Sequence, residues 1–197
     1  RGGSKRFPGK NLSFLGKKTL VRRSIDLAID TNIFDKILLS SDHEKILDEA
    51  KEVASKVDIH KRSNLLSNDT ATIKDLTISL CKTFDTNYKY VCIILPTAPF
   101  TLTEHIKNAH SQFMSNKDLD GIVSLTQYEF PPQFSISLKN DFIRPAFPNS
   151  PLITGNTRSQ NQDKLLRPNG AFYIFKIDYL LETKSFWKGK IIGYEMS

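Results

Sequence analysis

The sequence predicts an α/β fold, a sandwich in which helices cover a largely parallel β-sheet. Short apolar runs rich in β-formers alternate along the chain with stretches whose apolar residues recur at helical spacing. The chain has 197 residues, of which 39% are hydrophobic and 25% charged, as in a globular domain with one real core. The longest apolar runs are far too short to cross a bilayer, so we expect a cytoplasmic protein with no membrane partner.

The first elements follow this alternation in order. Residues 19–30 and 43–56 carry apolar residues three and four positions apart, which predicts two amphipathic helices. Residues 37–40 form a short buried run that ends at Ser41 and Asp42, and residues 57–59 form another. Two strands, each next to a helix, favour parallel pairing.

The middle of the chain continues the same alternation. We expect a helix to begin at Asp69-Thr70 and to carry its apolar stripe over residues 73–84. Residues 90–95 are an unbroken apolar run that Pro96 ends, which predicts a buried strand. Thr103 can cap the helix that follows, and residues 121–126 read as a further strand.

The alternation breaks over residues 128–168, which are rich in Pro, Asn, Ser and Gln. The one plausible strand there is at residues 134–138, and regular structure returns at 171–176. A segment of this length without strong periodicity is usually functional or an interaction arm. We therefore treat 128–168 as an insertion in a single domain of 1–197.

The formal charge of +7 points to a negatively charged partner, which could be a nucleic acid, an anionic surface or a small polyanion. No known nucleic-acid module with interleaved aromatic residues is visible. Cys81 and Cys92 lack a CxxC pattern and have no histidine at ligand spacing. Two buried thiols in a reducing compartment are therefore favoured over a disulfide or a zinc site.

The opening stretch, Arg-Gly-Gly-Ser-Lys-Arg-Phe-Pro-Gly-Lys-Asn over residues 1–11, has the composition of a phosphate-binding loop. Glycines let backbone N–H groups approach phosphate oxygens, and interspersed Arg and Lys neutralise their charge. It is neither a Walker motif nor a dinucleotide GxGxxG. By composition alone, a flexible basic tail is the alternative.

The same stretch resembles the signature loop of the acylneuraminate cytidylyltransferases, the CMP-sialic acid synthetases and their relatives. Weaker matches follow in the family's order. Residues 34–42 resemble its second strand, Arg62 with residues 67–72 resembles its Arg-Pro…Asp-Thr-Ala-Ser segment, and residues 95–99 resemble Gln-Pro-Thr-Ser-Pro. The last match is specific, because residues 167–174 read Arg-Pro-Asn-Gly-Ala-Phe-Tyr-Ile.

The resemblance implies a three-layer αβα sandwich with a Rossmann-like, nucleotide-binding sheet. It also implies that segment 128–168 is a dimerisation arm of a homodimer. The implied reaction joins CMP from CTP to the anomeric oxygen of a sialic-acid-like nine-carbon 2-keto-3-deoxy sugar acid and releases pyrophosphate, with Mg²⁺ as cofactor and no nucleic acid as partner. Positioning and charge neutralisation would do most of the work.

Residue roles follow from the same matches. Lys10 and Arg1 are the implied catalytic residues, with Lys10 against the α-phosphate of CTP. The residues implied to bind CTP are Arg1, Gly2, Gly3, Ser4, Lys5, Asn11, Arg62, Ala71 and Thr72. Without the family, a surface ion pair is the better interpretation of Arg62.

The resemblance implies a second set, which binds the sugar: Leu95, Arg158, Gln160, Asn169, Tyr173, Phe186 and Trp187. Arg158 matches an arginine that recognises the sugar carboxylate. Without the family, the three aromatic residues are more often part of a core. Leu95 stands where sialic-acid enzymes carry Gln, so we expect a modified substrate such as a legionaminic- or pseudaminic-type sugar.

Two departures concern the ends of the match. The family has a buried strand before the loop, and its metal-binding Asp-x-Asp is expected just beyond Ser197, so no metal ligand is assigned within this chain. If these residues were the entire polypeptide, we would expect poor Mg²⁺ binding and little turnover.

Other interpretations remain open at this stage. The chain could be another sugar nucleotidyltransferase, such as one for 3-deoxy-manno-octulosonate. It could instead be a non-catalytic basic nucleic-acid-binding module, or a catalytically dead relative kept for assembly.

Overall fold

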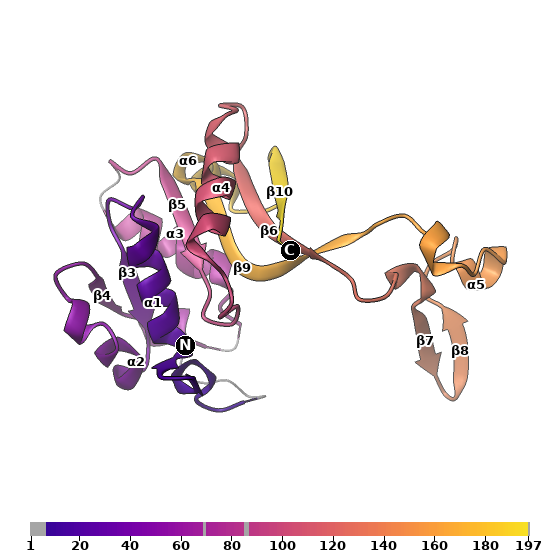
Figure 1. Ribbon diagram of the computed structural model, residues 1–197, viewed down its shortest axis with the longest axis horizontal. Coiled ribbons are helices and arrows are strands. Elements are labelled where there is room, and N and C mark those ends of the chain that lie inside the picture. The colour runs from indigo at the N-terminus through magenta and orange to yellow at the C-terminus, as the bar shows by residue number, and fades with distance from the viewer. Residues whose placement is uncertain (1–6, 69, 85–86, 197) are drawn as a thin grey trace. The chain divides into compact units, whose positions relative to one another are not determined.

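The computed structural model describes residues 7–68, 70–84 and 87–196, and it divides into two compact units (Figure 1). The first unit holds the chain up to Ser124 together with Gly170–Tyr194. The second holds Leu125–Asn169 and the residues from Glu195 on. The insertion expected at residues 128–168 therefore lies inside the second unit.

A four-stranded sheet has the order β10-β6-β9-β5, with β5 at Tyr90–Ile94, β6 at Gly121–Gln127, β9 at Leu166–Lys176 and β10 at Ile191–Glu195. β9 runs antiparallel to β5, with Ile93 opposite Tyr173. It is antiparallel to β6 as well, since Lys176 N–H donates to the Asp120 carbonyl while Phe172 lies against Ser124.

The predicted α/β class is confirmed, and the direction of β9 is the difference from a sheet of parallel strands. β6 and β9 are joined by residues 128–165, which contain no long crossover helix. A strand that returns without such a crossover pairs antiparallel with the one it left.

The remaining strands of the first unit are short. β1 (Phe14–Leu15) and β2 (Lys18–Thr19) pair antiparallel. β3 (Leu38–Ser41) and β4 (Asp58–Lys61) pair in parallel with Leu39 opposite Ile59, as expected for two strands joined by helical turns.

The helix expected over residues 43–56 is wrong as a single element. α2 covers only Glu44–Asp48, and a 3₁₀ turn follows at Lys51–Val53. Ala50 donates to the Leu47 carbonyl and Val53 to the Ala50 carbonyl, so the chain tightens to i→i+3 bonds. This tighter winding keeps the fully buried Ala50 in the core beside Ile46 and Val57.

Four longer helices form the outer layers. α1 (Leu20–Thr31) packs against α4 (Thr103–Met114), and α3 (Ile73–Thr83) packs against α6 (Ile177–Thr183). Figure 1 shows the two pairs on opposite faces of the strands, which gives the three layers. None of the helices in these described ranges is long and apolar enough to cross a bilayer.

Helix starts show what local sequence decides. α1 begins after Thr19, whose hydroxyl accepts the Arg22 N–H, in agreement with the expected start. α3 begins after Thr72 rather than at Asp69-Thr70, because Thr72 and Asp75 form a capping box; Asp69 itself lies outside the described residues. Thr103 does not cap α4 but is its first residue, since Leu102 occupies the cap position.

The second unit contains a hairpin of β7 (Ile136–Lys139) and β8 (Phe142–Pro145), with 3₁₀ turns at Pro132–Phe134 and Ser159–Asn161 and a one-turn helix α5 at Pro151–Thr154. Only one strand was expected here. Asn140 and Asp141 both have positive φ, 49° and 64°, the geometry of a two-residue hairpin turn.

Candidate functional site

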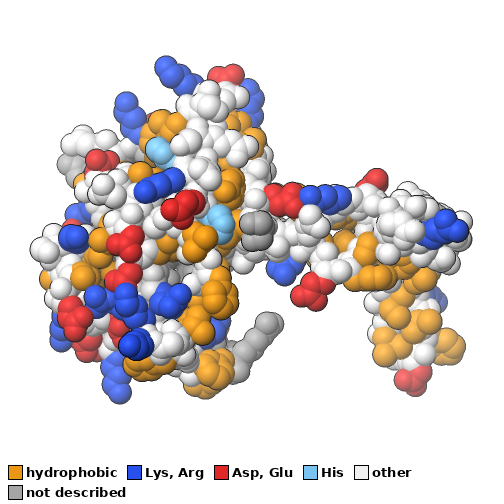
Figure 2. All heavy atoms as spheres, viewed as in Figure 1, with side chains coloured by type: hydrophobic (Ala, Val, Ile, Leu, Met, Phe, Trp, Pro, Cys, Tyr) orange, Lys and Arg blue, Asp and Glu red, His pale blue; other side chains and the backbone are white. Residues whose placement is uncertain are grey.

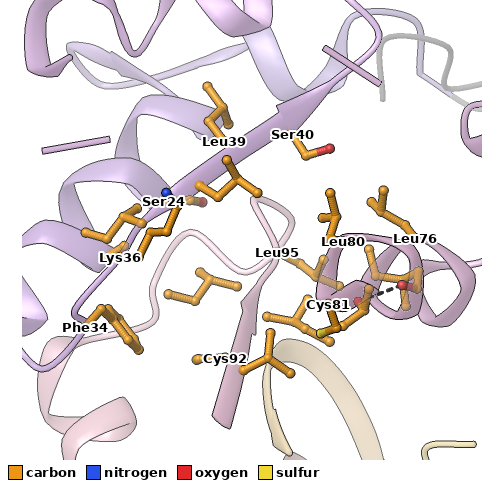
Figure 3. Close-up of a pocket in the computed structure, with 18 of the residues that line it drawn as sticks. Ser24, Phe34, Lys36, Leu39, Ser40, Leu76, Leu80, Cys81, Cys92 and Leu95 are labelled. Carbon is orange, nitrogen blue, oxygen red and sulfur yellow. Dashed lines mark hydrogen bonds between the residues drawn. The ribbon is translucent and has the colours of Figure 1, made fainter. Parts of the chain in front are cut away.

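A cavity of about 1150 Å³ lies inside the first unit, between β3 and β5 and between α1 and α3 (Figure 3). Figure 3 shows Leu39, Leu80 and Cys92 around this space, with Ser40 and Leu95 toward the same end of the two strands. Polar residues line both ends of this cavity: Asp35, Lys36 and Asn87 lie ahead of β3 and β5, and a second group lies where β3 and β4 end. We call this part the polar end and define it by Lys10, Asn11, Ser40, Arg62 and Thr72. Ligands of α/β sheets bind outside the carboxyl ends of strands.

Arg62 follows β4 directly and reaches across to β3. Its guanidinium donates to the Ser40 carbonyl at 2.8 Å and approaches the Ser40 hydroxyl at 3.4 Å. The same hydroxyl lies 3.0 Å from Nδ1 of His60. Burial and the positive charge of Arg62 lower the pKa of His60, so at neutral pH the cation of this group is Arg62. A braced guanidinium with an uncharged neighbour suits recognition of a polar, anionic ligand.

Lys10 and Asn11 reach the polar end from a 3₁₀ turn at Lys10–Leu12. Gly9 precedes the turn with φ of 70°, a conformation that glycine adopts without strain. The turn closes with Leu12 N–H donating to the Gly9 carbonyl at 2.8 Å. Of the predicted loop, Arg1, Gly2, Gly3, Ser4 and Lys5 lie outside the described residues.

Ala71 and Thr72 line the cavity from the turn before α3. The Ala71 N–H donates to the Asn68 side chain at 2.8 Å. The Thr72 hydroxyl donates to the Asp75 carboxylate at 2.6 Å and accepts the Asp75 N–H at 3.1 Å. The N–H of Ala71 and the hydroxyl of Thr72 are therefore already engaged within the chain, and any base contact here uses other atoms of the two residues.

Of the four expected sugar-binding residues in the first unit, Leu95 lines this cavity, whereas Tyr173, Phe186 and Trp187 do not. Leu95 is held by its N–H to the Ala171 carbonyl at 3.0 Å. Tyr173 is half-buried, and burial raises the pKa of its phenol. Phe186 is buried, with its ring centroid 4.6 Å from that of Phe175, whereas Trp187 is exposed. Phe186 is thus placed as a core residue.

The other three expected sugar-binding residues belong to the second unit. Arg158 and Gln160 are exposed, beside and within the 3₁₀ turn at Ser159–Asn161. The Asn169 amide donates to the Leu125 carbonyl at 3.4 Å and to the Met196 sulfur at 3.1 Å.

With this geometry in view, the comparison with known families is decisive. The family model described as "Cytidylyltransferase" matches residues 1–195. The chain belongs to the cytidylyltransferase family. This agrees with the resemblance drawn from the loop and from residues 167–174.

Several curated proteins are similar to this cytidylyltransferase chain. It is 30% identical to the N-acylneuraminate cytidylyltransferase of Streptococcus agalactiae serotype V, over 100% of this chain and 46% of that protein. It is 33% identical to a pseudaminic acid cytidylyltransferase of Campylobacter jejuni, over 88% of this chain and 74% of that protein. It is 28% identical to the CMP-N,N'-diacetyllegionaminic acid synthase of Legionella pneumophila, over 95% and 79%. The chain thus spans just under half of the streptococcal protein.

Solved structures support the same fold at lower identity. A CMP:2-keto-3-deoxy-manno-octonic acid synthetase complexed with CTP superposes with a TM-score of 0.69 at 12% identity, over 99% of this chain and 86% of that one. The 2-C-methyl-D-erythritol 4-phosphate cytidylyltransferase of Francisella tularensis gives 0.68 at 13% identity, over 100% and 87%. Both agree with the mixed α/β sheet described above.

The described part of this cytidylyltransferase chain holds no group of three or more His, Cys, Asp or Glu side chains that could bind a metal ion. The residues of the polar end are cationic or neutral, so their chemistry suits an anion rather than a cation.

Sequence reasoning missed Ser40 and His60. Ser40 receives Arg62, and His60 faces Ser40 across the parallel pair in the register Ser40 opposite His60. The available signal was that each of the two short strands carries a polar residue at its third position, Ser40 in β3 and His60 in β4. Their meaning depended on knowing that these strands pair in parallel and in this register.

Proposed function

We propose that the protein transfers CMP from CTP to the anomeric oxygen of a nine-carbon 2-keto-3-deoxy sugar acid and releases pyrophosphate. The observation that carries this proposal is the convergence of Lys10, Asn11, Arg62, Thr72 and Leu95 on one cavity. These residues are up to 85 positions apart in the sequence, and the resemblance had assigned each a role at CTP or sugar. The names of the three curated relatives given above each specify a nonulosonic acid that is joined to CMP.

The proposed chemistry uses groups of this chain for binding and charge. The anomeric hydroxyl attacks the α-phosphorus of CTP, a new P–O bond forms, and the bond to the β-phosphate breaks as the hydroxyl proton is released. Lys10 lies at the polar end and would stabilise negative charge on the α-phosphate. Arg62, braced by Ser40, would recognise the cytosine together with Asn11. Pre-positioned charge of this kind is the main source of catalysis in phosphoryl transfer.

We also propose Mg²⁺ as cofactor, because a divalent cation neutralises the charge that develops on the phosphates of a nucleoside triphosphate during transfer. The steps above depend on none of its ligands. A cytoplasmic location completes the proposal, since CTP is an intracellular metabolite.

For the sugar, we propose a modified nonulosonic acid of the legionaminic or pseudaminic type. Leu95 offers an apolar side chain to the cavity, with Gly170 as a close neighbour, where a glutamine would offer two hydrogen-bonding groups. The full-length protein should turn over these sugars with a higher kcat/KM than N-acetylneuraminate. The Leu95→Gln variant should show a smaller ratio between the two kcat/KM values. A clear preference of the unaltered protein for N-acetylneuraminate would overturn this part.

We further propose that the second unit pairs with a second copy of the chain. Its hairpin exposes Leu138 by 70% and Phe142 by 75%, with Ile136 and Ile143 also exposed, and Figure 2 shows hydrophobic side chains gathered there. Apolar patches of this kind mark interaction surfaces. Light scattering should give a dimer for the full-length protein and a monomer for Phe142→Glu with Leu138→Glu. Lys139→Glu on the same hairpin should leave the mass of the assembly unchanged.

The central test is a calorimetric titration of the full-length protein with CTP, UTP, ATP and GTP. We expect selective binding of CTP that Arg62→Ala abolishes and Lys10→Ala weakens. Lys17→Ala, an exposed lysine of the same N-terminal region, should bind as the unaltered protein does. Equal weak binding of all four nucleotides would reduce the site to a basic phosphate-attracting surface. Salt-dependent binding of DNA or RNA would then be the next measurement.

A further inference from the structure

Three polar side chains stand side by side on one face of the parallel pair β3 and β4. Ser40 lies opposite His60 in the register of the two strands. Arg62 continues β4 two positions further on, and its N–H donates to the Ser41 carbonyl at 2.8 Å. Because side chains alternate between the faces of a strand, His60 and Arg62 project to the same side, and the paired Ser40 projects with them.

His60 lies behind the surface that a ligand would meet. Ser40 and Arg62 both line the cavity, whereas His60 is not among the described residues that line it. Its ring instead packs edge-to-face with Phe84 at the end of α3, with 5.9 Å between the ring centroids. Any effect of His60 on a bound nucleotide must therefore pass through Ser40 and Arg62.

The Ser40 hydroxyl has one proton to donate, and its contacts decide where that proton goes. Arg62 carries only donors, so its Nε–H donates to the hydroxyl oxygen, at 3.4 Å. Within the described part of the chain, the other side-chain partner of this oxygen is Nδ1 of His60, at 3.0 Å. The hydroxyl proton therefore goes to Nδ1, which accepts it, and the ring carries its own proton on Nε2. Burial and the charge of Arg62 lower the pKa of His60, which keeps the ring uncharged at neutral pH.

This arrangement gives the guanidinium two acceptors on one residue. The Ser40 carbonyl accepts one N–H at 2.8 Å, and it is fixed because it belongs to the backbone of β3. The Ser40 hydroxyl can rotate unless its proton is held, and His60 holds it, so a lone pair stays directed at Nε of Arg62. Two contacts along one edge fix the plane of a guanidinium, which a single contact leaves free to turn.

We propose that His60 is a positioning residue for base recognition, acting through the Ser40 hydroxyl on the guanidinium of Arg62. The inference rests on the function proposed above, in which Arg62 meets cytosine. Cytosine presents acceptors at O2 and N3, whereas uracil carries an N–H at position 3. A guanidinium has only donors, so its orientation decides how well it accepts cytosine and rejects uracil. His60 thereby contributes to the choice of CTP over UTP without touching either nucleotide.

The measurement is the ratio of CTP to UTP affinity, from calorimetric titrations of the full-length protein. His60→Phe keeps an aromatic ring beside Phe84 but removes the acceptor, so the ratio should fall about tenfold while the affinity for UTP stays nearly unchanged. His60→Asn offers an amide oxygen near the place of Nδ1 and should keep most of the ratio. Lys61→Ala, on the opposite face of β4, should leave the ratio as it is. A ratio in His60→Phe within about twofold of the unaltered protein would overturn the proposal.

A second variant tests the route of the effect. Ser40→Ala should reproduce the loss, and its combination with His60→Phe should lose no more than either change alone, because both remove one contact. Losses that add would show two separate effects and overturn the proposal.

Nitrogen NMR of the His60 ring needs no variant and decides even where Ser40→Ala fails to fold. In the nucleotide-free protein at neutral pH, Nδ1 should be unprotonated and Nε2 protonated. A proton on Nδ1 would contradict the inference.

Failure of the proposed function has a different signature. It appears in the unaltered protein, as equal binding of all four nucleotides, and it would remove the role of His60 in base choice as well. Failure of this inference alone leaves the unaltered protein selective for CTP and appears only in the variants or in the ring protonation.

Discussion

The Arg62 guanidinium donates to the Ser40 carbonyl at 2.8 Å, and this bond ties the end of β4 to the end of β3. The Ser40 hydroxyl in turn lies 3.0 Å from the His60 ring. One arginine thus ties two strands together and adds to the burial that lowers the pKa of a neighbouring histidine. The structural and electrostatic roles can be separated by choosing which property a substitution removes.

Arg62→Ala should raise the pKa of His60. Burial lowers that pKa first, and the Arg62 charge lowers it further, so removing the charge moves it back toward 6.5. Arg62→Lys keeps the charge and should leave the titration nearly in place. A proton NMR titration of the His60 ring measures both variants, and an unchanged curve in Arg62→Ala would contradict the electrostatic coupling.

The same depressed pKa has a consequence for stability. The unfolded chain binds a proton at His60 near pH 6.5, whereas the folded chain resists it to lower pH. The contribution of His60 to the free energy of unfolding is therefore fully present above pH 6.5. It is lost as the pH falls through the pKa that His60 has in the folded protein.

Tyr179→Phe should destabilise the protein by about 1–3 kcal/mol. The buried Tyr179 hydroxyl accepts the N–H groups of both Lys188 and Gly189, each at 3.0 Å. Phenylalanine keeps the ring against Phe175 but leaves two donors without an acceptor. Urea unfolding measures the change, and Tyr90→Phe on a partly exposed ring is the control. Equal effects of the two substitutions would argue against this role.

Gly121→Ala should cost about 1–3 kcal/mol through overpacking. A Cβ at this position would stand 2.2 Å from Cδ1 of Phe175 and 2.8 Å from the Ile174 carbonyl. The carbonyl is backbone of β9 and cannot rotate away, so the two strands must separate. Thermal unfolding should show a lowered midpoint, whereas Ser111→Ala on the exposed face of α4 should not. A midpoint within error of the unaltered protein would show that β9 yields easily.

Asp75 should titrate at about 2, since the Lys74 ammonium and then Thr72 hydrogen-bond its carboxylate. The group lies below its ordinary 3.8, so its support of the α3 start is present above that pH and is lost as the pH falls through about 2. Lys74→Ala should raise the pKa, and Lys82→Ala at the other end of α3 should not. Carboxyl carbon NMR gives the values, and a titration near 3.8 in the unaltered protein would contradict the capping geometry.

Local sequence was enough for the elements whose signals are local. The bounds of α1 and β5 were predicted to within a residue or two, because apolar spacing and a proline stop act over a few positions. The broken helix at residues 43–56 was not, since burial of Ala50 rather than helix propensity decides the winding there. For Phe186 the sequence left two interpretations, a sugar contact implied by the resemblance and a core residue, and the structure buries its ring against Phe175.

By itself the sequence determined the alternation of strands and helices, the cationic loop and the family resemblance, all of which are written in short stretches of residue types. Only the tertiary structure decided that β9 runs antiparallel, that Ser40 and His60 lie beside Arg62, and that β3 and β5 line one cavity. These features depend on which strands meet and in which register. Such pairing is set by contacts between residues far apart in the chain, and no local pattern encodes them.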